Sequence, residues 1–152
     1  MPALQARAAV FLAALWWGSL SGLGFVVVPL LFKHLGSPAE AGAMAAKLFS
    51  AQTWVSVACT MLLLLMLNRK DALPTDSNTE LRKVTAWAVA GLLLALLVEF
   101  GVAAQIVNAR ASGGNLRLWH ALGSAMYLAQ WCCAGLALWR VSSWRSAGHA
   151  EP

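Results

Sequence analysis

The feature that constrains this chain most is a set of four long apolar stretches that carry almost no charge. They cover residues 8–32, 48–67, 84–107 and 118–139. A helix needs about 20 apolar residues to cross a hydrocarbon core about 30 Å thick, and each stretch is long enough. None of them alternates apolar and polar residues as a half-buried strand does. The sequence therefore predicts four transmembrane helices.

Two capping boxes place the start of the second and third helices. They read Ser37-Pro38-Ala39-Glu40 and Ser77-Asn78-Thr79-Glu80. In such a box the first side chain accepts a hydrogen bond from the backbone of the fourth residue, and proline favours the first helical position. We expect an all-α integral membrane four-helix bundle that forms a single domain over residues 1–152. Its helices are expected at about 8–32, 38–67, 80–107 and 118–140, with a flexible connection at 109–115.

Composition and charge fit a membrane protein and indicate how it is threaded. Charged residues make up 11% of the chain, against about 25% in a soluble domain. Of the 11 Lys and Arg residues, seven fall on the side that holds both termini and four on the other. The positive-inside rule then places both termini in the cytoplasm, and we expect a multi-pass protein of the bacterial inner membrane. The basic residues flank apolar runs, so the expected partner is the lipid bilayer and not nucleic acid.

The first helix carries a helix-packing motif. Gly18 and Gly22 are four residues apart, and Ser21 lies between them. Lipid provides no hydrophobic drive for helix association, so small residues that allow close backbone contact mark packing faces. Two interpretations stay open, namely contact within the bundle and a face for a homodimer or a larger membrane complex.

Glu99 is the one charged side chain inside the predicted spans. An ionisable group in a transmembrane helix normally faces the interior and has a partner. A structural interpretation is a protonated acid that is hydrogen-bonded to Gln52, Gln130 or Ser56. A functional interpretation is a proton-relay, cation or substrate site, which would make the chain a small proton-coupled transporter.

Two histidines define a further candidate site. His34 follows the first apolar stretch and His120 opens the fourth, so both are expected near the outer interface. Their imidazole nitrogens could hold haem or a metal, although ordinary hydrogen bonds at the interface are the alternative. Beyond this possibility of haem, the sequence predicts no cofactor. The three cysteines lie within apolar runs and are interpreted as packing residues. The sequence contains no glycine-rich phosphate loop, no G-x-S-x-G and no H-E-x-x-H, and it indicates no catalytic residue.

These residues resemble a known family. The run from Trp17-Gly18-Ser19-Leu20 through Phe25, Pro29 and Phe32 to Lys47-Leu48-Phe49 resembles the N-terminal half of the bacterial domain-of-unknown-function 4149 proteins, which are similar to eukaryotic transmembrane protein 205. Arg117-Leu118-Trp119-His120 with Ser124 resembles the start of that family's last helix, with Trp119 in place of the usual Leu. The resemblance covers about residues 10–140. It implies a small four-helix membrane protein with no settled biochemical activity.

The chain departs from the family pattern at two places. Glu99-Phe100 stands where a proline-containing outer half of the third helix is usual, and the outer loop is short. A weaker similarity is to four-helix haem- or copper-associated membrane proteins, including the integral-membrane protoporphyrinogen oxidases, whose first-helix histidine is matched roughly by His34. The sequence therefore favours a non-enzymatic accessory or scaffold protein. The alternatives are a haem- or metal-binding redox protein using His34 and His120, and a proton-coupled transporter using Glu99.

Overall fold

The computed structural model describes residues 2–68 and 78–147, and nearly all of them are helical. The helical segments run in the order α1 (Pro2–Gly22), η1 (Leu23–Val27), α2 (Val28–His34), α3 (Pro38–Leu67), α4 (Asn78–Leu97), η3 (Val98–Val102), α5 (Ala103–Ser112) and α6 (Leu116–Ala147). Here η1 and η3 are single π-helical turns inside longer helices. The described ranges contain no strand.

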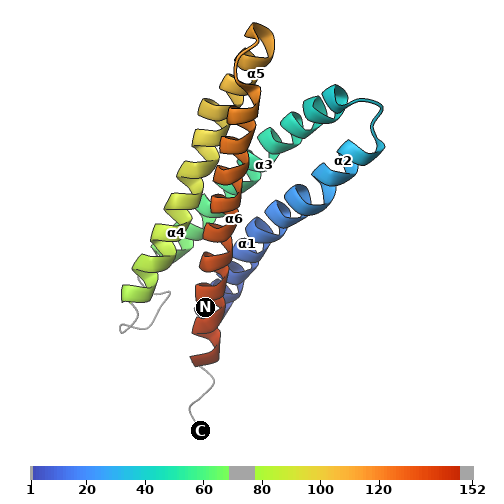
Figure 1. Ribbon diagram of the computed structural model, residues 1–152. Helices are drawn as coiled ribbons and strands as arrows, with labels where there is room; N and C mark the ends of the chain where they lie inside the picture. Colours follow the sequence, from blue (N-terminus) through green and yellow to red (C-terminus); the bar gives the residue numbers. More distant parts are fainter. Residues whose placement is uncertain (1, 69–77, 148–152) are drawn as a thin grey trace.

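These segments form four long rods that run alternately up and down (Figure 1). The first rod is α1–η1–α2, the second is α3, the third is α4–η3–α5, and the fourth is α6. Around the bundle, α1 packs against α3 and α6, and α4 packs against the same two helices. All four rods are long and apolar enough to cross a membrane, so the prediction of an all-α bundle with four candidate spans is confirmed.

Helix α3 has the predicted bounds, and the predicted capping box is formed at its start. The side chain of Ser37 accepts a hydrogen bond from the backbone N–H of Glu40 at 3.2 Å, and α3 starts at Pro38 and ends at Leu67. The second predicted capping residue, Ser77, lies outside the described residues. The helix it was expected to start is present from Asn78 onwards.

The connection predicted at 109–115 is much shorter than expected. The third rod stays helical to Ser112 and ends at Gly113, whose φ of 73° is left-handed. Gly114 then donates its N–H to the carbonyl oxygen of Ala109 at 2.9 Å, which satisfies one of the last carbonyls of the helix. The fourth rod starts at Leu116, two residues earlier than predicted, and continues to Ala147. The apolar stretches therefore end before the helices do.

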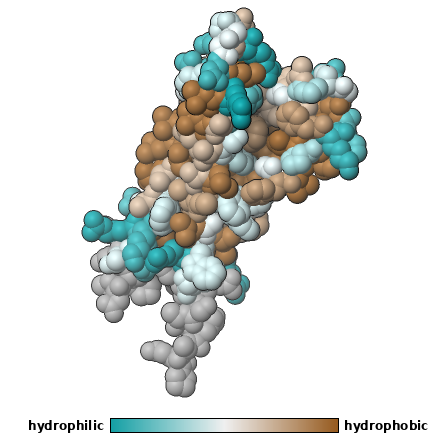
Figure 2. Space-filling view, in the orientation of Figure 1, coloured by the Kyte–Doolittle hydropathy of each residue, from teal (hydrophilic) through white to brown (hydrophobic). Residues whose placement is uncertain are grey.

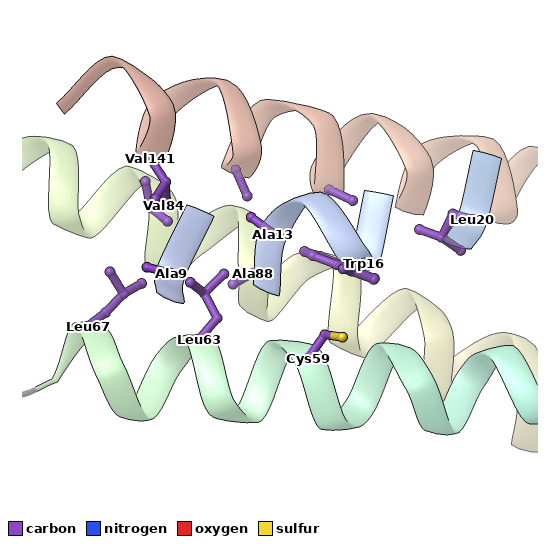
Figure 3. Packing of buried hydrophobic residues seen from close by; sticks show 12 residues of the cluster. Ala9, Ala13, Trp16, Leu20, Cys59, Leu63, Leu67, Val84, Ala88 and Val141 are labelled. Carbon is purple, nitrogen blue, oxygen red and sulfur yellow. The ribbon is translucent and has the colours of Figure 1, made fainter. Parts of the chain in front are cut away.

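The densest packing lies in the half of the bundle where the first rod begins and the fourth ends. Trp16 and Leu20 of α1, Leu63 of α3, Val84 of α4 and Val141 of α6 are all almost fully buried there (Figure 3). Gly91 lets α4 approach the ring of Trp16, because a methyl group at that position would lie 2.5 Å from Cη2. This half is held together by one large indole packed against small residues on its neighbours.

The outside of the bundle is apolar, as the hydrocarbon layer requires. Large exposed side chains include Phe11, Trp54, Leu65, Phe100 and Trp139. Figure 2 shows a hydrophobic surface along the middle of the rods and hydrophilic residues toward their ends. A soluble domain of this size does not expose so continuous an apolar surface.

In the opposite half of the bundle, the hairpin formed by the first and second rods diverges from the hairpin formed by the third and fourth rods. Figure 1 shows α2 with the start of α3 on one arm, and α5 with the start of α6 on the other. The π-turn η1 in the first rod comes just before Pro29. Proline cannot donate a backbone hydrogen bond and its ring crowds the preceding turn, and a widened turn is one way in which a membrane helix accommodates it.

Candidate functional site

The bundle interior contains a polar cluster that joins three rods. Gln52 of α3 donates from Nε2 to the hydroxyl of Ser19 on α1 at 2.9 Å. Gln130 of α6 donates from Nε2 to the hydroxyl of Ser56 on α3 at 3.0 Å, and Gln52 approaches the same hydroxyl at 3.5 Å. Gln52, Ser56 and Gln130 are buried. Because its members use one another as partners, this cluster links the rods and offers few free polar groups.

A second pair of polar contacts joins α1 to α6. The indole Nε1 of Trp131 donates to the hydroxyl of Ser21 at 2.8 Å, and the hydroxyl of Tyr127 donates to the carbonyl oxygen of Leu20 at 2.8 Å. Tyr127 also meets Phe49 of α3 edge to face, with ring centroids 5.1 Å apart. Ser21, which the sequence assigns to a packing face, therefore acts inside the bundle.

Glu99 lies within the π-turn η3 and is paired with a serine. The hydroxyl of Ser50 on α3 donates to Oε1 of Glu99 at 2.6 Å. In the same turn the backbone N–H of Ala103 donates to the carbonyl oxygen of Val98, five residues back, as in a π-helix. Such turns are frequent at functional sites. The observed partner of Glu99 is therefore Ser50 and not one of the three predicted residues. Gln52 and Gln130 both direct their side-chain amides to the hydroxyl of Ser56 instead.

Glu99 is deep in the apolar part of its rod. Lys83 precedes it by 16 residues and Arg110 follows it by 11, which correspond to about 24 Å and about 16 Å along a helix. Between these two cations the rod has no other charged residue. A charged side chain at the centre of a membrane helix costs at least about 2.5 kcal/mol on insertion scales. An intramembrane carboxyl group therefore normally has a polar partner, which for Glu99 is Ser50.

The two glycines of the predicted packing motif face away from the other rods. A methyl group on Gly18 or Gly22 would meet no other side chain or neighbouring rod within 4 Å. The glycines that do allow close approach are different ones. A methyl group on Gly24 would lie 2.8 Å from Cε1 of Tyr127, and one on Gly135 would lie 3.0 Å from Nε1 of Trp17. Contact within the bundle thus does not explain the Gly18 and Gly22 pair.

The structure places the two histidines apart. His34 is the last residue of α2 and His120 lies in the first turns of α6, and both are exposed. Figure 1 shows these two segments on different arms of the molecule. Within the described residues, no group of three His, Cys, Asp or Glu side chains comes together as metal ligands do. The structure therefore does not bring His34 and His120 together.

A charged cluster lies at the end of the bundle where the third rod begins. Glu80 contacts Nζ of Lys83 at 2.6 Å and Nη1 of Arg140 on α6 at 2.5 Å. Glu80 precedes the uncharged part of its rod, which starts after Lys83. Hydrogen bonds from Lys83 and Arg140 lower the pKa of the Glu80 carboxyl. The cluster ties α4 to α6 outside the apolar layer.

One comparison with known proteins identifies a family. The model of the family described as "Domain of unknown function (DUF4149)" matches residues 11–115, which is more than half of the chain. No curated protein and no solved structure matches the chain.

Proposed function

The chain belongs to the DUF4149 family, and we propose that it is a non-enzymatic scaffold or accessory protein of the bacterial inner membrane that pairs with a second copy through its first rod. The observation that carries this proposal is the open face at Gly18 and Gly22. Both glycines lie in the middle of an apolar span, yet no neighbouring rod approaches either of them.

The open glycines are part of a longer stripe on α1. Phe11, Ala14 and Leu15 are exposed and lie one or two turns before Gly18 on the same side of the helix. Bulky residues thus flank a line of small ones formed by Ala14, Gly18 and Gly22. From these residue sizes we infer a shallow groove along the line of small residues, with ridges beside it.

A second copy is the occupant that this shape favours. In lipid, helices associate through close van der Waals contact, and small residues four apart allow two backbones to approach. In a two-fold pair the same face meets itself, so the groove and ridges of one α1 can accept those of the other. A stripe that supplies both features satisfies this requirement without any other protein.

The role of the interior polar residues is also consistent with a scaffold. Ser19, Gln52, Ser56 and Gln130 hydrogen-bond one another across three rods. These bonds fix the rotation of α1 relative to α3 and α6, and they thereby keep the Gly18 face turned outwards. The interior supports the surface that we assign to association.

The location and orientation are part of the same proposal. The side of the bundle that holds both termini receives seven of the 11 Lys and Arg residues. Three of these seven lie outside the part of the chain whose side chains are described. The positive-inside rule places this side in the cytoplasm. The charged cluster at Glu80, Lys83 and Arg140 then lies at the cytoplasmic interface.

Disulfide crosslinking in membranes tests the pairing. Ala14 is exposed one turn before Gly18, and Ala14→Cys in a background lacking Cys59, Cys132 and Cys133 should give a covalent dimer on oxidation. Adding Gly18→Leu should abolish the dimer, because the leucine side chain keeps the two backbones apart.

Gly101→Leu is the matched control. Gly101 is also exposed with open space around it, but it is on the third rod. The dimer should persist in this variant. The proposal is wrong if Gly18→Leu leaves the crosslinking unchanged, or if Gly101→Leu removes it equally.

A further inference from the structure

We infer that a groove between the end of α3 and the start of α4 binds an anionic phospholipid, with an acyl chain along the groove and the phosphate beside Arg82. The groove lies at the end of the bundle where the first rod begins and the fourth rod ends. Neither of its two helices carries the pairing face on α1, so the lipid site does not depend on the proposed function.

The α3–α4 groove is an apolar hollow of about 360 Å³. Its volume is within the range of ligand sites in proteins, which is about 300–1,000 Å³. The aliphatic part of its lining consists of Met61, Leu64, Leu65 and Leu67 of α3 and Leu81 and Val89 of α4. Met61, Leu65 and Val89 are also exposed, so the groove opens toward the surroundings of the bundle. In a membrane these surroundings are lipid tails, and an acyl chain is the ligand that this lining fits.

The groove begins at the boundary of the apolar layer. Asn68 and Thr85 supply the polar part of its lining. Asn68 directly follows the apolar stretch of α3, and the uncharged part of the third rod starts after Lys83. From Leu81 to Val89 the groove follows α4 for about 12 Å, which is less than the hydrocarbon depth of one leaflet, about 15 Å. A lipid of this leaflet can therefore place its chain in the groove and its headgroup at the boundary.

Arg82 gives the boundary end of the groove a positive charge. It precedes Val89 by seven residues, or about two helical turns, so both lie on the groove side of α4. Arg82 is exposed, whereas the nearby cations Lys83 and Arg140 are both paired with Glu80. A guanidinium can donate two parallel hydrogen bonds to a phosphate. A cation beside an apolar groove thus complements a lipid that combines a net negative headgroup with an acyl chain.

Native mass spectrometry of the full chain in detergent tests the site. The protein is titrated with phosphatidylglycerol or with phosphatidylcholine that has the same two oleoyl chains, and bound lipid is identified by its mass. Because the two lipids differ in net charge and not in their chains, the ratio of their affinities measures the preference for an anionic headgroup. We expect the unmodified protein to prefer phosphatidylglycerol. Arg82→Gln should reduce this preference about fivefold, the effect of one arginine beside an anionic lipid.

Arg7→Gln is the matched control for charge. Arg7 is also exposed at the end of the bundle where the first rod begins, but it lies on α1 and does not line the groove. The preference for phosphatidylglycerol should persist in this variant. An equal loss in Arg7→Gln and Arg82→Gln would show a general attraction to surface charge and would overturn the inference.

Val89→Trp tests the groove itself. The larger side chain should occupy the hollow, so binding of both lipids should fall. Val107→Trp is the matched control, because Val107 is an exposed valine of the same rod that does not line the groove. Helical circular dichroism should be retained in every variant, since all four positions are exposed. The inference is also overturned if the unmodified protein binds the two lipids equally, or if Val89→Trp lowers binding no more than Val107→Trp does.

Discussion

Replacing Gly91 with alanine should force the most crowded contact of the bundle apart. The added methyl group would lie 2.5 Å from Cη2 and 2.7 Å from Cζ2 of Trp16. Carbon atoms in good contact are about 3.5–4.0 Å apart, so the indole has to move by about 1 Å. Trp16 is fully buried among side chains of the other rods, so its ring can move only if these neighbours move too.

The expected size of the effect follows from this clash. Overpacking of a well-packed core costs about 1–3 kcal/mol. The extra methyl group brings no compensating hydrophobic gain, because the unfolded reference state also has its helices in lipid or detergent. Alanine does favour the helix over glycine by about 1 kcal/mol, and this gain must be measured separately.

Gly18→Ala supplies that control. A methyl group at Gly18 meets nothing within 4 Å, so this variant reports helix propensity alone. Both proteins are unfolded by SDS in excess detergent micelles, where chains are too dilute to associate, and the transition is followed by circular dichroism. Gly91→Ala should be less stable than Gly18→Ala by about 1–3 kcal/mol. Equal stabilities would refute the claim that the Trp16–Gly91 contact is tight.

Two further predictions concern the charged end and the orientation. Because Lys83 and Arg140 lower the pKa of Glu80, this carboxylate contributes stability above its unfolded pKa and loses it as the pH falls through the folded value. Glu80→Gln should therefore flatten the acid side of the stability–pH profile, whereas an unchanged profile would show that the cluster contributes nothing. A green fluorescent protein fused after Arg145 should fluoresce, because this reporter folds in the cytoplasm, and one fused after Gly113 should stay dark. The reverse pattern would contradict the proposed orientation.

The sequence predicts the four rods because the solvent imposes their length. Twenty or more uncharged residues in succession have few alternatives to a membrane helix, since every backbone group must be satisfied internally. The start of α3 is also predictable, because the bond between Ser37 and Glu40 is local and needs no tertiary contact. These features depend on residues close together in the chain.

The end of the third rod is not predictable from hydropathy. The apolar stretch stops at Val107, but the helix continues through Asn108 and Arg110 until Gly113 adopts a left-handed conformation. Polar residues do not end a helix once it has left the hydrocarbon layer. The glycine was the better signal, since helices commonly end at such a residue.

The partner of Glu99 depends on the rotation of the rods, which the sequence does not reveal. The expected partner was Gln52, Gln130 or Ser56, yet Glu99 pairs with Ser50. The π-turn at η3 adds a residue to one turn and rotates everything beyond it relative to a regular helix. No proline marks this turn in the sequence, in contrast to Pro29 after η1. A prediction that assumes regular helices places the wrong face opposite α3.

The sequence also does not reveal which way Gly18 and Gly22 face. A small-residue motif shows that a face can approach another helix, but it does not say which helix. Trp17 contacts Trp131 with ring centroids 5.6 Å apart, and this pair turns the Trp17 and Ser21 side of α1 toward α6. Gly18 and Gly22 are consequently left on the outside. The indole contacts orient the motif together with the interior hydrogen bonds, and neither can be predicted from residue spacing alone.

The two halves of the bundle are held together by forces of different strength. Near the termini, buried indole and aliphatic side chains fill the space between all four rods, and many contacts must be lost before any rod moves. Toward the opposite end, the Ser50–Glu99 bond is the polar link between α3 and η3. Hydrogen bonds between membrane helices are worth about 0.6 kcal/mol on average. The rods therefore separate more easily in the half that contains this bond than in the half that orients the Gly18 face.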